Sequence, residues 1–220
     1  MCGRMAITMS QEAMTKLFSA VPANDLPMVP NYNVCPTDKI HSVISDGSTR
    51  HLKAMRWGFL PNWYKSKTDG PLLINARSET IAQKPAFRAS CRHRRCLIPA
   101  DGFYEWMRRD RNTPVPYRVV RSDGQLMAMA GVWQNWEVDG QSITSCAVVT
   151  TSANAKMAEI HHRLPVIVRP EDWPLWLGES GKGAAALMRP VSDSVLDLRR
   201  VSIAVNSNRA SGPELWVIED

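Results

Sequence analysis

The stretch "LMAMAGVWQNWEVDGQSITSCAVVTT" (126–151) places two runs of apolar and β-branched residues on either side of a turn sequence. The runs, "LMAMAGVW" (126–133) and "ITSCAVVTT" (143–151), are typical of buried β-strands. Between them, "VDG" (138–140) has the residue types that favour a turn. The stretch therefore predicts two strands of a sheet and directs the search toward a β-rich fold.

Further strand-like stretches occur on both sides of this one, and most are short and bounded by turn residues. They are "HLKAMRWGF" (51–59), "CLIPA" (96–100), "FYEWM" (103–107), "PYRVVR" (116–121), "LPVIV" (164–168) and "VSIAV" (201–205).

Helical patterns are fewer and short. The three expected helices are 10–18 with Ser10 as N-cap, 152–160 with Ser152 as N-cap, and 170–178 ending at Gly178. Strands outnumber helices and do not alternate with them, which disfavours a wound parallel sheet. We expect an α+β fold, in which a mixed or antiparallel sheet curls like a barrel and short helices flank it.

Length and composition set further limits. The 220 residues contain no repeat or linker, so a single domain over 1–220 is expected. No apolar run approaches the roughly 20 residues that span a bilayer, and the N-terminus lacks a signal-peptide pattern. The five cysteines form no small disulfide framework, which indicates reduced thiols. We therefore expect a cytoplasmic protein without membrane contact.

The chain is basic, with 27 Lys and Arg against 21 Asp and Glu, a net charge of +6. Such a balance permits a polyanionic partner without requiring one, because runs of charge often form an ordinary solvated surface. Two local runs stand out: "CRHRRC" (91–96), with Arg92, Arg94 and Arg95, and "MRRDR" (107–111), with Arg108, Arg109 and Arg111.

Cys2 follows the initiator methionine in "MCGRMA" (1–6). Removal of Met1 would leave an α-amino group, with a reference pKa of about 7.7–8.0, beside a thiol with a reference pKa of about 8.5. Both groups would be partly nucleophilic near neutral pH. The alternative is an incidental cysteine near a terminus.

Several polar residues lie where a plain core strand would not place them. Asn75 and Arg77 follow an apolar triplet, where buried polar groups need partners or a purpose. Glu105 alternates with Tyr104 and Trp106, so it either points to the interior as a candidate general acid or lies on an exposed edge strand.

Histidines and aromatics supply further candidates. His161 and His162 lie between an expected helix and an expected strand, a position that suits either a structural or a catalytic histidine. Trp63 and Tyr64 follow a turn-like "PN" and either stack on nucleobases or belong to the core. Cys91, His93 and Cys96 lack a second ligand pair with zinc-site spacing, so no metal is expected.

Taken in order, these segments resemble the SRAP family, the SOS-response-associated peptidase domain that shields abasic sites in single-stranded DNA. The resemblance extends from Cys2 to about Trp216. Its specificity comes from the combination of motifs rather than from any one of them. The matching stretches are "MCGR", "YNVCP", "WGFLPNW", "INARSET", "RCLIPADGFYEW", "AGVW", "IHHRLP" and "VNSNRASGPEL".

The resemblance implies a covalent reaction at Cys2. After loss of Met1, the amine of Cys2 would condense with the aldehyde of a ring-opened abasic deoxyribose, and the thiol would close a thiazolidine ring. Asn75 would orient the amine or the sugar. Glu105 would act as general acid and base, and His161 would assist opening of the sugar ring.

The resemblance also implies a set of contacts to single-stranded DNA and no cofactor. Arg4, Arg77 and Arg163 would bind phosphates, and Asn33, Pro36, Trp63 and Tyr64 would wedge or stack flanking bases. The chain departs from the family pattern at Cys35, His162 and Ser211. The departures at Cys35 and His162 could alter DNA contacts or redox sensitivity without changing the implied chemistry. A monomer is expected, associated with the nucleoid when bound to damaged DNA.

Other classes of protein remain open at this point. Glutamine amidotransferases with an N-terminal nucleophile also begin with Cys-Gly after Met, and a glutaminase assay would distinguish them. A non-covalent single-strand binding module would have the same basic cleft but form no adduct. The family's peptidase activity is interpreted as removal of Met1, by autocatalysis or by an aminopeptidase.

Overall fold

The computed structural model describes residues 2–23, 25–108 and 114–219. The quoted stretch forms its longest antiparallel pair, β10 (Met127–Val138) and β11 (Gln141–Ser152), in register from Gly131 opposite Val148 to Val138 opposite Gln141. Asp139 and Gly140 turn the chain with positive φ angles of 49° and 75°. The two predicted strands are confirmed, and each is longer than its apolar run.

A ring of pairings closes around this pair. β10 pairs with β7 (Arg95–Ala100), β7 with β4 (Lys39–Ser45), and β4 with β5 (Arg50–Trp57). β5 then pairs in parallel with β11, so β5–β4–β7–β10–β11 forms a closed barrel. Closure removes the free edges of the sheet and lets inward side chains fill the centre.

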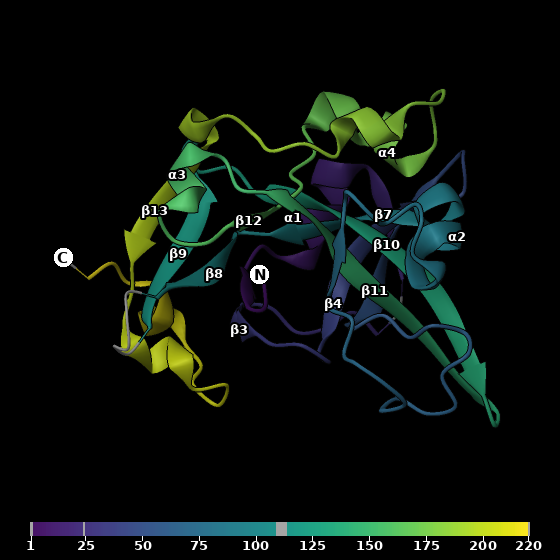
Figure 1. Cartoon of the computed structure of the whole chain (residues 1–220), viewed down its shortest axis with the longest axis horizontal. Helices are drawn as coiled ribbons and strands as arrows, with labels where there is room; N and C mark the ends of the chain where they lie inside the picture. Colours follow the sequence, from purple (N-terminus) through teal and green to yellow (C-terminus); the bar gives the residue numbers. More distant parts are fainter. Residues whose placement is uncertain (1, 24, 109–113, 220) are drawn as a thin grey trace.

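A second sheet lies beside the barrel and contains the N-terminal strand (Figure 1). Its order is β13 (Leu196–Arg200), β9 (Val115–Arg121), β8 (Gly102–Met107), β1 (Met5–Ile7) and β3 (Asn31–Val34). Three short strands extend the barrel sheet: β12 (Arg163–Pro165) and β6 (Asn75–Arg77) pair with β11, and β2 (Ala20–Pro22) pairs with β5. The expected α+β fold with a barrel-like sheet is confirmed.

The helices are short, as expected, with differences in detail. α1 (Gln11–Phe18) has Ser10 as its N-cap. α3 (Ala155–Ala158) starts later than expected, because Asn154 rather than Ser152 accepts the capping bond, from the Met157 amide. α4 (Trp173–Leu177) follows a 3-10 turn over Pro170–Asp172 and ends at Gly178 in the left-handed region.

Residues 201–205 were expected to form a strand, and this prediction is wrong. Ile203–Asn206 form a 3-10 helix whose first turn is capped by Ser202. Val201 and Val205 bury their side chains against Tyr104 and Leu215. The apolar residues of this segment therefore pack in a small cluster and not on the face of a sheet.

The sequence patterns also missed α2 (Pro85–His93). Its inner face is narrow, since the buried residues are Phe87 and Ser90. The remaining 3-10 helices are Ala184–Leu187, Asp193–Val195 and Pro213–Trp216. No helix in the described part of the chain is long and apolar enough to cross a membrane.

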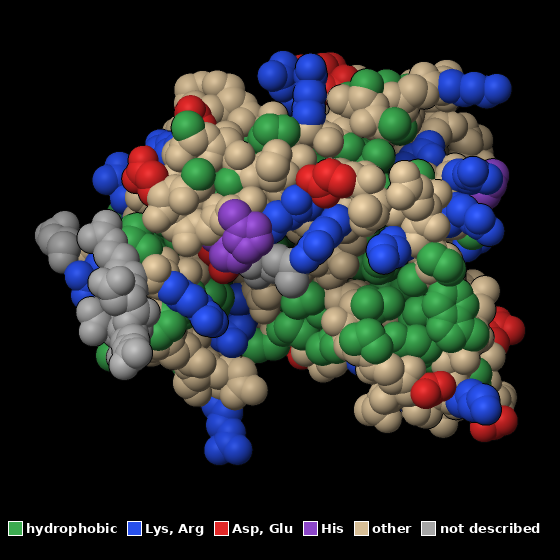
Figure 2. All heavy atoms as spheres, in the orientation of Figure 1, with side chains coloured by type: hydrophobic (Ala, Val, Ile, Leu, Met, Phe, Trp, Pro, Cys, Tyr) green, Lys and Arg blue, Asp and Glu red, His purple; other side chains and the backbone are tan. Residues whose placement is uncertain are grey.

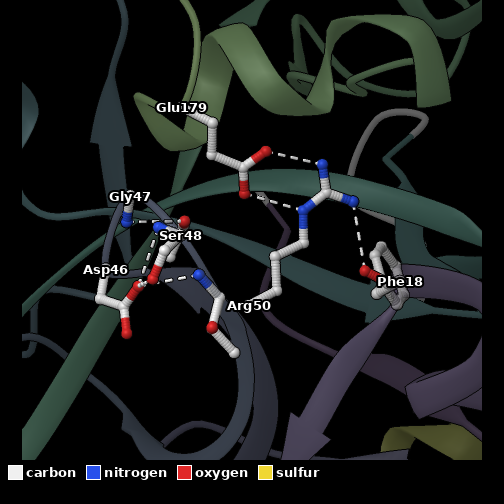
Figure 3. A network of polar contacts seen from close by, with 8 residues as sticks. Phe18, Asp46, Gly47, Ser48, Arg50 and Glu179 are labelled. Carbon is white, nitrogen blue, oxygen red and sulfur yellow. Dashed lines mark hydrogen bonds and ion pairs between the residues drawn. The ribbon is translucent and has the colours of Figure 1, made fainter.

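A polar clamp joins distant parts of the chain (Figure 3). The Arg50 guanidinium on β5 donates from Nε and Nη2 to the two carboxylate oxygens of Glu179, at 2.8 and 2.7 Å. Its Nη1 donates to the carbonyl of Phe18 at the end of α1, at 3.1 Å. The clamp therefore ties the barrel to α1 and to the turn after α4.

Candidate active site

Cys2 lies at the junction of the barrel and the second sheet, with 1% of its surface exposed. On the side of the second sheet, the amide of Tyr104 on β8 donates to the carbonyl of Arg4 at 2.9 Å. On the barrel side, Asn75 Nδ2 on β6 donates to the carbonyl of Cys2 at 2.8 Å. Two segments far apart in sequence thus hold the backbone around Cys2.

The other end of the Asn75 amide is available. Its Oδ1 is buried and has no hydrogen-bond partner among the described residues. A buried acceptor without a donor costs free energy, so such an atom suggests a role beyond folding. Because Nδ2 already contacts the Cys2 carbonyl, Oδ1 can accept a bond from a donor close to Cys2.

Glu105 approaches the same place from β8 and is 5% exposed. Of the two orientations that the sequence left open, the structure has the one in which Glu105 points to the interior. Tyr104 is also fully buried, because the C-terminal 3-10 segments cover the opposite face of β8. Burial raises the pKa of the Cys2 thiol, and the negative charge of Glu105 raises that pKa further.

His161 lies between α3 and β12, and its Nδ1 accepts a hydrogen bond from the Arg163 amide at 3.0 Å. The neutral ring therefore carries its proton on Nε2. Burial lowers the pKa of His161, while the charge of Glu105 acts in the opposite direction. The His162 ring stacks on it, with centroids 4.3 Å apart and planes inclined by 27°.

Two hollows flank this centre. One, of about 900 Å³, contains Glu105 and His161 in its lining, and the other, of about 500 Å³, contains Asn75. Figure 2 shows histidine side chains on this face with Lys and Arg side chains on either side. A polyanion that lay across the face would meet both hollows and pass over the region of Cys2.

Arg4 and Asn33 form one unit rather than two independent contacts. Arg4 Nη1 donates to Asn33 Oδ1 at 2.6 Å and to the carbonyl of Val205 at 2.9 Å. Asn33 is 6% exposed, and its Nδ2 donates to the carbonyls of Ser207 and Ala210. In this arrangement Asn33 positions Arg4 and the C-terminal segment.

The two other candidate phosphate ligands differ in availability. Arg77 is exposed at the end of β6 and lines the hollow beside Asn75. Arg163 has a side chain only 10% exposed, and its Nη1 and Nη2 donate to the carboxylate oxygens of Glu79 at 2.8 and 2.9 Å. A phosphate on Arg163 would have to share or replace Glu79.

The candidate base-contacting residues are also unequal. Trp63 is 57% exposed, whereas Tyr64 is 8% exposed and packs with Leu60 and Trp136. Trp63 can present a face to a base, and Tyr64 supports the loop beneath it. Pro36 is half-buried in the turn after β3.

Sequence analysis missed several residues of the site. Trp106 lines the larger hollow, lies 5.7 Å from the Arg4 guanidinium, and donates from Nε1 to Asn206 Oδ1 at 2.6 Å. Asn206 and Glu79 lie within quoted motifs, but nothing local assigned them a partner. Arg109, Arg111 and Met1 lie outside the described residues.

The basic run 91–96 is divided by the fold. Arg94 and Arg95 donate to backbone carbonyls, including those of Trp133 and Trp176, and Cys96 is buried in the core. Arg92 remains exposed. Among the described residues, no group of three or more His, Cys, Asp and Glu side chains is arranged to hold a metal ion.

The fold and the site together define a class of protein: an α+β barrel protein with a buried cysteine beside an amide and a carboxyl, and with an imidazole next to that carboxyl. A sequence profile described as SOS response associated peptidase (SRAP) matches residues 1–208, and the chain belongs to this family.

Comparison with known proteins agrees with this assignment. The chain is 36% identical to the abasic site processing protein YoqW of Bacillus subtilis and 31% identical to the abasic site processing protein YedK of Escherichia coli, with 98% of both chains covered in each case. A crystal structure of a protein from Bacteroides thetaiotaomicron has the same fold, with a TM-score of 0.86 at 23% identity over 97% of this chain and 98% of that one.

Proposed function

We propose that this protein processes abasic sites in single-stranded DNA by forming a covalent crosslink through Cys2. In the proposed reaction Met1 is removed first, by autocatalysis or by an aminopeptidase, which exposes the α-amino group of Cys2. The substrate is the ring-opened deoxyribose of an abasic site, which carries an aldehyde. The adduct protects the damaged strand.

The reaction balances without an external oxidant or reductant. The Cys2 amine adds to the aldehyde carbon, and the carbinolamine loses water to give an imine. The thiol then adds to the imine carbon, its proton passes to the nitrogen, and a thiazolidine ring closes. Because burial raises the pKa of the thiol, little thiolate is present at neutral pH, which favours attack by the amine before the thiol.

Each neighbouring side chain has a role consistent with its position. Asn75 Oδ1 accepts a hydrogen bond from the Cys2 amine and orients its lone pair toward the aldehyde. Glu105 transfers protons during loss of water, and His161 exchanges a proton with the sugar oxygen as the ring opens. Arg4, Arg77 and Arg163 bind phosphates, and Trp63 stacks on a flanking base.

One observation supports this proposal more than any other: the Asn75 amide donates at one end to the Cys2 carbonyl, and at its other end has no partner among the described residues. A non-covalent DNA-binding module has no need for a buried, unused acceptor at the N-terminus. The names of the relatives independently support abasic-site processing. The cytoplasmic location and the monomeric state stay predictions.

The first test is crosslinking by the mature protein. Incubation with an oligonucleotide that contains one abasic site should give a heat-stable adduct on a denaturing gel, and the intact mass of the protein should lack one methionine. Cys2→Ala keeps an amine but lacks the thiol, so it should form only a reversible imine that borohydride can trap.

Two results would contradict the mechanism. A stable adduct from protein that fully retains Met1 would exclude the terminal amine, and a heat-stable adduct from Cys2→Ala would exclude the thiol. Binding without any adduct would favour the non-covalent module, and release of ammonia from glutamine would favour the amidotransferase class.

A further inference from the structure

The outer face of α2 carries cations that the proposed reaction does not use. Lys84, at the N-cap position, and Arg88 and Arg92, within the helix, are all exposed. Their spacing of four residues places them on one side of the helix, about 6 Å apart along its axis at each step. The result is a row of positive charges that we call the α2 track: Lys84, Arg88 and Arg92.

Within residues 2–23, 25–108 and 114–219, no carboxylate neutralises the α2 track. Among the described residues, none of the three side chains forms an ion pair, whereas Arg50, Arg121 and Arg163 each have a carboxylate partner. The first turn of α2 also contains no acidic residue. Three cations that face solvent without a counter-charge attract a polyanion by releasing its counterions.

The inner face of α2 fixes the helix firmly in place. Phe87 is 7% exposed, and its ring lies 5.1 Å from that of Phe59. Ser90 is buried and accepts a hydrogen bond from Arg94 Nη2 at 3.1 Å. The track is therefore attached to a rigid element, and its cations are free to serve a partner.

The α2 track is continuous with the candidate active site. Lys84 lines the hollow of about 500 Å³ together with Arg77 and Asn75, and Asn75 contacts the Cys2 carbonyl. A line of cations thus leads from the reaction centre through Arg77 and Lys84 onto the helix. Figure 2 shows Lys and Arg side chains over α2 and an adjoining hydrophobic area.

The hydrophobic area identifies the kind of partner. Trp63 and Leu72 are 57% and 49% exposed, and Trp63 lines the hollow beside Lys84. Aromatic surface next to a basic groove is what binds unpaired bases, because each base offers a flat face for stacking while its phosphate contacts the cations. A duplex keeps those faces stacked inside.

We propose that the α2 track binds the backbone of single-stranded DNA on one side of the lesion, several nucleotides away from Cys2. This inference rests on the proposed function for the location of the lesion. It adds a second segment of contact, which makes affinity depend on the length of one flank. The nucleotides between the lesion and the α2 track would present their bases to Trp63 and Leu72.

The test uses the double variant Arg88→Gln/Arg92→Gln, called the α2 variant. The control is the double variant Arg199→Gln/Arg200→Gln, which removes two positive charges from β13 in the five-stranded sheet. Lys84 is left intact because it borders the site. The probes are undamaged and abasic single strands lengthened stepwise on the 5′ side or on the 3′ side. Wild type should gain affinity as one flank, and not the other, is extended.

The α2 variant should lose that gain, whereas the control should keep it. Loss of two phosphate contacts should reduce the slope of log affinity against log salt concentration by about 1.4. The α2 variant should then bind roughly 25-fold more weakly than wild type at 0.1 M salt, and the two affinities should become equal near 1 M salt. With a short abasic probe at saturation, the α2 variant should crosslink at the wild-type rate.

Several outcomes would overturn the α2 track. These are a wild type without length dependence, an α2 variant with the wild-type salt slope, or an equal loss in the control variant. A gain that appears only with a duplex flank would exclude the single-strand assignment. Since undamaged probes need no chemistry, absence of any covalent adduct would count against the proposed function alone.

Discussion

At the scale of single residues, Glu105 is the side chain on which the proposed crosslinking mechanism most depends. It is buried beside Cys2 and can exchange protons during loss of water from the carbinolamine. Glu105→Gln keeps the shape but removes the acid, so we expect crosslinking to slow by about 10²-fold or more. The measurement is a single-turnover crosslinking rate, with affinity for an undamaged strand as the control.

His161 provides the matched comparison for that experiment. If it assists only sugar-ring opening, His161→Ala should lose less rate on a pre-opened aldehyde than on a natural abasic site. Glu105→Gln should be slow on both substrates. A wild-type rate in Glu105→Gln would assign Glu105 to structure and the proton transfer to another group.

At the scale of elements, β4 contains a buried histidine, His41. His41 is 1% exposed, and neither ring nitrogen has a hydrogen-bond partner among the described residues. Burial lowers the pKa of His41 to about 4. In the unfolded chain this imidazole binds a proton as the pH falls through about 6.5, whereas in the folded protein it stays neutral down to about pH 4.

The sign of the effect on stability follows from this difference. As pH falls from about 6.5 to about 4, protonation favours the unfolded state, so the free energy of unfolding should fall by up to about 3 kcal/mol through this group. In His41→Leu this pH-dependent part of the free energy of unfolding should be absent. Urea unfolding at pH 7, 5.5 and 4 measures it. The exposed His93→Leu is the control, and an equal pH dependence in wild type and His41→Leu would refute the account.

At the scale of the whole molecule, the Arg50–Glu179 clamp joins parts of the chain that are more than a hundred residues apart. Both side chains are 18% exposed, and the two oxygens of Glu179 each accept one hydrogen bond from Arg50. Arg50→Lys keeps the charge but cannot make the paired contact. We expect a loss of about 1–2 kcal/mol in the free energy of unfolding.

The control for the clamp is Arg169→Lys, since Arg169 and Glu171 form an ion pair with both side chains more than 60% exposed. Exposed pairs contribute little, so this variant should stay within about 0.5 kcal/mol of wild type. Equal effects in the two variants, measured by urea unfolding, would mean that the clamp adds no more than surface charge does.

The sequence alone determined the strands around 126–151 and the caps at Ser10 and Gly178, whereas it left the orientation of Glu105 open. These features depend on residue type and on the short repeat of strand or helix, so local pattern is sufficient. The motifs also indicated the family, and with it the candidate residues Cys2, Asn75 and His161.

Only the tertiary structure decided how these pieces meet. Closure of the barrel depends on β5 pairing with β11 about ninety residues later, and no local pattern encodes such a pairing. The 3-10 helix at 203–206, the burial of Tyr64 and the pairing of Arg163 with Glu79 each arise from neighbours distant in sequence. The same holds for Asn75. Pairing of β6 with β11 places Asn75 beside the N-terminus, where its Nδ2 donates to the Cys2 carbonyl. Burial there excludes the water that would otherwise form hydrogen bonds with the amide.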